Sequence, residues 1–128
     1  MNIAIKIKRH DIGNIQQLFK LMFEINIEFI DYIRFYNISG ILQKIQKINF
    51  NSNFTHKKIF TLNLNPNEAK EFLTLVSQSS NLIQQNAYFK ALILEFTTAI
   101  HKQLSTLESQ KNNLANNLIL TIPKTLNR

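Results

Sequence analysis

Apolar and polar residues alternate in two short stretches of the chain, and each stretch leads into a helical pattern. Ile3, Ile5 and Ile7 alternate with polar or small residues, which predicts a half-buried strand over residues 2–9. The same alternation predicts a second strand over residues 58–64. A strand that runs into a helix therefore occurs twice, 57 residues apart, and this suggests a fold built from two similar halves.

Two helices are expected between the strands. Apolar residues at spacings of three and four predict a long helix over residues 12–36, with Asp11 as its N-cap. This helix is apolar on most of its circumference, so we expect it to be central in the fold or to lie in an interface. A break at residues 37–40 should precede a shorter helix over residues 41–48, and the Asn-rich residues 49–53 predict a turn.

The second half of the chain contains the clearest helix boundary. Asn65 offers an N-cap, Pro66 a first helical residue and Glu68 the acid of a capping box, which together predict a helix over residues 66–78. Beyond it the expected segments are an interruption at residues 79–81, a long helix at 82–109, a loop at 112–117 and a last strand at 118–122.

These elements predict a helix-rich α+β fold in the order β-α-α-β-α-α-β. We expect a small sheet of two or three short strands packed against a long central helix, in a single compact domain over residues 1–128. The direction of the strands is open, and parallel pairing is possible. The strand–helix pattern that occurs twice suggests half-repeats at residues 1–57 and 58–114, followed by a strand or tail at 115–128. Since 45% of the residues are hydrophobic, many matches arise by chance, and the repeat is an architectural hypothesis.

The composition limits the cellular compartments in which the protein is expected. The absence of cysteine excludes disulfides, thiolate metal sites and cysteine nucleophiles, and it suits a reducing compartment. Lys6, Lys8 and Arg9 interrupt what would have to be the apolar core of a signal peptide, and no stretch suits a membrane span. We therefore expect a cytoplasmic protein, or one of an organelle matrix if it is organelle-encoded, that is not secreted and has no membrane partner.

The net charge of +7 has two possible explanations. Nine of the 15 basic residues lie in residues 1–58, which favours a polyanionic partner for that half of the chain. However, Asn, Ile, Lys and Phe make up 58 of the 128 residues, and all four have A- and T-rich codons. An AT-rich genome enriches lysine without selection for binding, so the charge is either functional or compositional.

Candidate chemistry is sparse. His10 and Asp11 follow the first strand, where a histidine oriented by a carboxylate would suit a general base, although a helix cap explains Asp11 equally well. Glu24, Glu28 and Asp31 would share one helical face and offer oxygen ligands, but nearby basic residues make surface ion pairs the simpler explanation. With two glycines a phosphate-binding loop is excluded, and we predict no enzyme, cofactor, metal or small-molecule ligand.

Three functions fit this sequence, and all three involve binding a macromolecule. The first is binding to a protein partner or self-association, with aromatic residues of the first long helix as candidate interface: Phe29, Tyr32, Phe35 and Tyr36. The second is a phosphate-led nucleic-acid contact of an AT-rich bacterium, mobile element or phage, with these candidates: Lys6, Lys8, Arg9, Lys44, Lys47, Lys57 and Lys58. The third is a subunit of an organelle-encoded assembly such as a ribosome.

Overall fold

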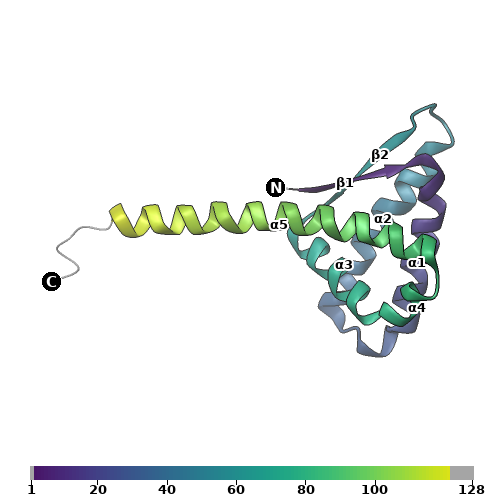
Figure 1. Ribbon diagram of the computed structural model, residues 1–128, viewed down its shortest axis with the longest axis horizontal. Helices are drawn as coiled ribbons and strands as arrows, with labels where there is room; N and C mark the ends of the chain where they lie inside the picture. The colour runs from purple at the N-terminus through teal and green to yellow at the C-terminus, as the bar shows by residue number, and fades with distance from the viewer. Residues whose placement is uncertain (1, 122–128) are drawn as a thin grey trace.

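The chain folds into a two-stranded sheet packed on one face against helices, with one long helix that projects from the body (Figure 1). The structure, a computed structural model, describes residues 2–121, with side chains described as far as residue 118. The elements in chain order are β1 (Ile3–Lys8), the 3-10 turn η1 (Arg9–Asp11), α1 (Ile12–Ile25), the 3-10 turn η2 (Ile27–Phe29), α2 (Tyr32–Ser52), β2 (Ile59–Leu64), α3 (Pro66–Gln78), α4 (Ser80–Gln84) and α5 (Ala87–Thr121). The predicted helix-rich α+β class, with a small sheet against a long helix, is confirmed.

Both strands lie where the alternation predicted them, and they pair antiparallel. Ile3 lies opposite Leu64, and Lys8 lies opposite Ile59. The odd-numbered residues of β1 are buried, as are Leu62 and Leu64 of β2, whereas Lys6 and Lys8 are exposed. Successive side chains of a strand point to opposite faces. The sheet therefore has one face in the core and one face in water, and the parallel pairing that the sequence left open is not formed.

Three aromatic rings form the centre of the core, with one pair stacked and the other pair tilted. Phe72 of α3 lies between Phe19 of α1 and Phe96 of α5, with 6.0 Å between ring centroids in both pairs. All three side chains are almost completely buried. Isoleucines of β1 and α2 pack around them. The three rings thus connect three helices that are far apart in the sequence.

The capping box at the start of α3 forms as predicted, and it also fixes the position of α2. Asn65 accepts a hydrogen bond from the amide of Glu68, and the Glu68 carboxylate accepts one from the amide of Asn65. The same buried carboxylate pairs with Lys44 of α2. A Cβ at Gly40 would collide with the other oxygen of Glu68, so a larger residue there would have to displace this buried carboxylate.

The first long helix is shorter than predicted, and the chain turns within the predicted span. α1 ends at Ile25, because the buried side chain of Asn26 donates to the carbonyl of Met22 and to the hydroxyl of Ser79. A new helix begins after Asp31, whose carboxylate accepts a hydrogen bond from the amide of Arg34. The prediction of one helix over residues 12–36 was therefore wrong.

The predicted break at residues 37–40 and the predicted turn at 49–53 were also wrong, because α2 is helical from Tyr32 to Ser52. Its buried residues Ile38, Ile41 and Ile45 pack against the core. Helix propensities differ by less than about 1 kcal/mol per residue for most residues, so packing of this face outweighs the poor helix formers beside it.

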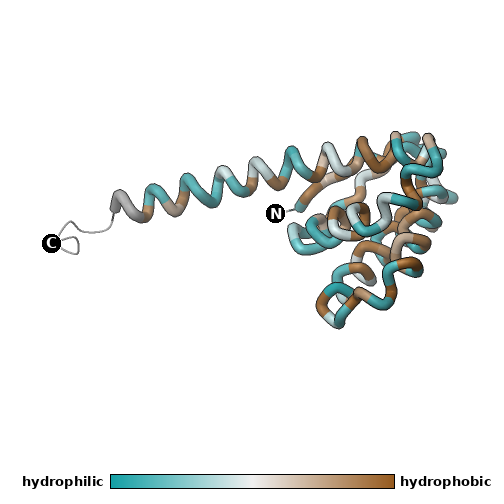
Figure 2. Tube along the Cα trace, turned by 60° about the horizontal axis from the view of Figure 1, so that its bottom comes forward, coloured by the Kyte–Doolittle hydropathy of each residue, from teal (hydrophilic) through white to brown (hydrophobic). Residues whose placement is uncertain are grey.

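The last helix is longer than predicted. α5 begins at Ala87, after the short α4, and continues to Thr121, so the predicted loop at 112–117 and the strand predicted at 118–122 are helical as far as 121. Residue 122 lies outside the described residues. Extending an existing helix needs no new nucleus, so asparagines can continue it. Figure 2 shows apolar residues where α5 crosses the body and a mixed pattern where it projects.

The long helix that packs against the sheet is thus α5, and not the helix that the sequence indicated as central. The order strand–helix occurs twice, in β1–α1 and in β2–α3. The two halves differ afterwards, since α1 is followed by the long α2 and α3 by the five-residue α4. The half-repeat stays a prediction.

Candidate interaction surfaces

The turn between α1 and α2 carries a run of exposed apolar side chains, which we call the aromatic corner. Its members are Ile25, Ile27, Phe29, Tyr32, Ile33, Phe35 and Tyr36. Their exposed fractions range from 52% for Phe35 to 93% for Tyr32. All four residues that the sequence suggested as an interface lie in this corner. The sequence placed them on a helix that is apolar nearly all round, whereas the structure places them at a bend between two helices.

A buried ion pair holds the aromatic corner in place. The guanidinium of Arg34 bonds both oxygens of Glu71 on α3, at 2.9 to 3.1 Å. It also donates to the carbonyl of Phe29, at 3.0 Å. The hydrogen bond to Glu71 is the main reason that the pKa of Arg34 is raised. Because one side chain joins the bend to α3, the corner is fixed before any partner arrives.

The corner is uneven, with a hollow on each side of its most exposed residues. A hollow of about 230 Å³ is lined by Phe23, Ile27 and Ile30 among others. A second hollow, of about 540 Å³, lies between Tyr36 of α2 and Lys70 of α3. The first hollow is lined mainly by apolar residues and the second mainly by polar ones. Protruding aromatic side chains, with an apolar centre and a polar rim, are typical of protein–protein interfaces.

Two of the seven basic residues suggested for nucleic acid are engaged within the fold. Lys44 pairs with the buried Glu68. The guanidinium of Arg9 donates to the carbonyls of Ser52, Thr55 and Lys57, and it lies 5.5 Å from the centroid of the Phe60 ring. Arg9 therefore organises the loop between α2 and β2. The sequence offered Arg9 and Lys44 as phosphate contacts, and the structure gives both a structural role.

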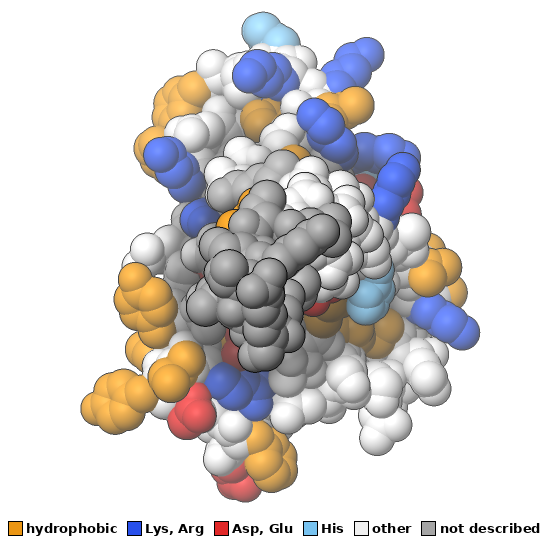
Figure 3. Space-filling view, turned by 90° about the vertical axis from the view of Figure 1, so that its left-hand side faces the viewer, with side chains coloured by type: hydrophobic (Ala, Val, Ile, Leu, Met, Phe, Trp, Pro, Cys, Tyr) orange, Lys and Arg blue, Asp and Glu red, His pale blue; other side chains and the backbone are white. Residues whose placement is uncertain are grey.

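The other five are exposed and lie on different parts of the molecule. Lys6 and Lys8 lie on the outward face of the sheet, and Lys6 donates to the hydroxyl of Thr61. Lys57 and Lys58 belong to the loop before β2, whereas Lys47 belongs to α2. Figure 3 shows Lys and Arg side chains gathered at the top of the view and acidic side chains mostly below. The basic residues thus favour one end of the molecule without forming one continuous patch.

Two exposed phenylalanines, which no pattern in the sequence singled out, lie at the same end. Phe50, near the end of α2, and Phe54, in the loop, contact each other with ring centroids 5.2 Å apart. Lys57 and Lys58 follow them closely in the chain. Aromatic rings next to lysines are a common arrangement for stacking on unpaired bases.

His10 and Asp11 adjoin each other, but Asp11 is engaged elsewhere. The two side chains are 3.4 Å apart, and that of His10 is 75% exposed. The carboxylate of Asp11 accepts a hydrogen bond from the hydroxyl of Tyr88 on α5 and does not cap α1 as predicted. Partial burial, and then this bond to Asp11, raise the pKa of Tyr88. Asp11 therefore joins α5 to the start of α1.

The three carboxylates considered as metal ligands do not share a helix face. Glu24 belongs to α1, Glu28 lies in the turn η2, and Asp31 caps α2. Within residues 2–121, no group of three His, Asp or Glu side chains is placed to hold a metal ion. None of the helices in this part of the chain combines the length and hydropathy that a membrane crossing requires. Comparison with protein-family models, curated proteins and solved structures gives no match.

Proposed function

We propose that this chain is a small non-enzymatic binding protein that associates with another protein, or with a second copy of itself, through the aromatic corner. The observation that carries this proposal is the run of seven apolar side chains, each more than half exposed. The lack of cysteine suits a reducing compartment, so we place this association in the cytoplasm.

Physical arguments support the corner as a binding surface. Contiguous exposed apolar surface is unfavourable in water, and burial contributes about 25 cal/mol per Å². Tyr32 and Tyr36 combine large rings with hydroxyls that can bond water or a partner at an interface rim. Since Arg34 and Glu71 already fix the bend, little conformational entropy is lost on binding.

Removing both tyrosines tests the proposal. We expect Tyr32→Ser with Tyr36→Ser to weaken association at least about thirtyfold, because a single hot-spot aromatic residue contributes about 2 kcal/mol or more. Sedimentation velocity over a concentration series measures self-association. Photo-crosslinking from position 32 in cell extract, with the products identified by mass spectrometry, measures association with another protein.

Phe54→Ser is the matched control, since Phe54 is also an exposed aromatic residue but lies at the other end of the molecule. It should leave association unchanged. A chain that stays monomeric and gives no more crosslinks from position 32 than from position 54 would reject the proposal.

A second candidate function is binding of single-stranded nucleic acid at the loop that contains Phe54, Lys57 and Lys58. With about three lysine–phosphate contacts, the slope of log K against log salt should be near −2. Fluorescence anisotropy with labelled single-stranded RNA and DNA measures this slope. We expect Lys57→Gln with Lys58→Gln to reduce the magnitude of this slope by about 1.4, since each contact to a single strand contributes about 0.7. We expect Phe54→Ser to weaken binding at all salt concentrations.

Lys90→Gln, at an exposed lysine of α5, is the control for these variants. Binding that is absent at low salt would show that the charge is compositional. Binding that these loop variants do not change would reject this loop as the site. Membership of an organelle-encoded assembly stays a prediction, and such an assembly would be expected to cover the aromatic corner.

A further inference from the structure

The outward edge of β1 runs alongside α5, and one glutamine connects the two. The side-chain amide of Gln103 accepts a hydrogen bond from the amide of Ala4, at 2.8 Å, and donates one to the carbonyl of Ala4, at 2.7 Å. A neighbouring strand would make this same pair of bonds. Gln103 therefore acts as one residue of a missing third strand. At the other end of β1, Tyr88 of α5 bonds Asp11, so the helix spans the length of the strand.

Beyond Ala4 this edge is open. The odd-numbered residues of β1 bond β2, and the bond from the amide of Arg9 to the carbonyl of Lys58, at 2.8 Å, continues that series. Peptide groups alternate along a strand, so those of Lys6 and Lys8 point to the same side as those of Ala4. Within the described part of the chain, no side chain bonds the amide or carbonyl of Lys6, or the amide of Lys8, on that side.

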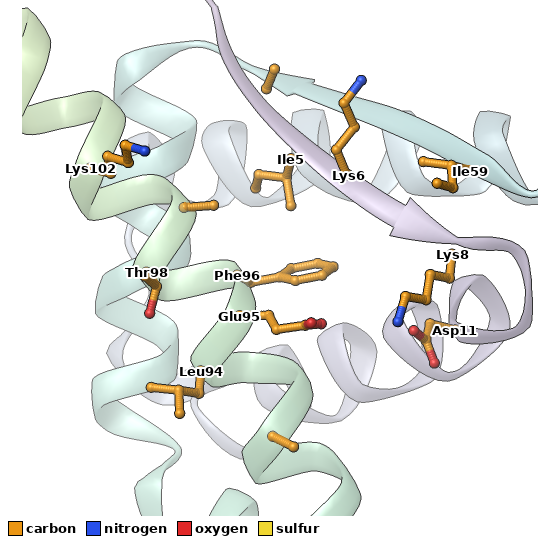
Figure 4. Close-up of a pocket in the computed structure, with 13 residues that line it drawn as sticks. Ile5, Lys6, Lys8, Asp11, Ile59, Leu94, Glu95, Phe96, Thr98 and Lys102 are labelled. Atoms are coloured by element: carbon orange, nitrogen blue, oxygen red, sulfur yellow. The ribbon is translucent and has the colours of Figure 1, made fainter.

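A groove lies between this edge and the helix. It has a volume of about 620 Å³ and is mostly apolar, with Ala91, Leu94 and Ala99 on the helix side. Figure 4 shows the ring of Phe96 reaching from α5 towards β1, with the side chains of Glu95 and Lys8 extending into the same space. The two alanines leave room beside the strand. A groove between a strand edge and a helix is the setting in which several domains bind peptides by strand addition.

We propose that this groove binds an extended acidic peptide as an added strand on β1. The occupant must be extended, because only a strand presents peptide groups that match those of Lys6 and Lys8 in alternation. It must also be a single segment, since α5 flanks the edge and keeps a second folded sheet away.

The charges around the groove favour acidic side chains. Lys6, Lys8 and Lys102 line it, against Glu95 and Asp11. The Asp11 carboxylate accepts a hydrogen bond from Tyr88 and keeps its charge, so three lysines and two carboxylates line the groove and their balance is +1. This site is separate from the aromatic corner, so the two can be tested independently.

Amide hydrogen exchange and binding assays on the full chain test the proposal. The probe is a fluorescein-labelled eight-residue peptide of alternating Glu and Val. We expect the peptide to slow exchange at the amides of Lys6 and Lys8 about tenfold or more, while the amides of Ile5 and Ile7, already bonded to β2, change little. Thr98→Trp should fill the groove and weaken peptide binding at least about tenfold.

His101→Trp is the matched control, because it adds the same ring at another exposed position of α5 that does not line the groove. It should bind the peptide like the unchanged chain. A peptide with Lys in place of Glu, and one with methylated backbone amides, should both bind about tenfold more weakly. The proposal is overturned by no binding, by equal binding of the Lys peptide, or by binding that leaves the exchange of Lys6 and Lys8 unchanged.

Discussion

Phe72→Ala is expected to lower the free energy of unfolding by about 4 kcal/mol, the largest effect of any single substitution that we predict. Phe72 is almost completely buried, and its ring lies between Phe19 and Phe96, so its loss leaves a cavity where three helices meet. Urea unfolding followed by circular dichroism measures the change.

Phe50→Ala is the control, since Phe50 is an exposed phenylalanine, and its effect should stay within about 0.5 kcal/mol. If Phe72→Ala does not fold, Phe72→Leu keeps most of the volume and should cost about 1 to 1.5 kcal/mol. A loss of less than about 1 kcal/mol for the alanine variant would show that the three rings are not the centre of the core.

Arg34→Ala is expected to cost about 3 kcal/mol, because it leaves the carboxylate of Glu71 buried without its charged partner. The side chains of Arg34 and Glu71 are 18% and 5% exposed, so solvent screens this pair little. Because the pKa of Arg34 is raised in the folded state, its contribution is fully present below the ordinary pKa of arginine and constant across the neutral range.

A double-mutant cycle separates the ion pair from other losses. Arg34→Ala with Glu71→Leu removes both charges, so it should cost less than Arg34→Ala alone. Arg34→Lys should restore only part of the stability, since an ammonium group cannot bond both carboxylate oxygens in the fork geometry of arginine. Equal effects of Arg34→Ala in the presence and absence of Glu71 would contradict this account.

The parts of the fold that the sequence predicted well have local causes. The two strands alternate because each has one face in the core, and that alternation is visible in the residues themselves. The start of α3 was predictable because Asn65, Pro66 and Glu68 satisfy the helix end within four residues.

The errors have causes that are distant in the sequence. α1 ends where Asn26 meets Ser79, and α2 continues through Gly40 because its buried isoleucines pack against the core. Neither contact can be read from neighbouring residues. Asp31 is a local N-cap signal that the apolar spacing hides, because the apolar series continues on both sides of it.

For the candidate surfaces too, neighbouring residues indicate some features, whereas others depend on contacts that are distant in the sequence. The aromatic residues near Tyr32 could be selected from the sequence, since they are large and clustered, but their exposure depends on the bend before α2. Neighbouring residues in the sequence could not show that Lys44 pairs with Glu68 or that Arg9 bonds loop carbonyls, because both partners are distant in the chain. The groove beside β1 depends on how α5 packs, and no pattern in the chain indicates it.

The bonds made by Arg9 restrict how this chain can vary in length. Exposed loops usually tolerate inserted or deleted residues, because their backbone has few fixed partners. In the loop before β2, however, three carbonyls from Ser52 to Lys57 converge on one guanidinium. A residue added or removed there would turn at least one carbonyl away from Arg9. This loop should therefore keep its length where other surface segments of the molecule vary.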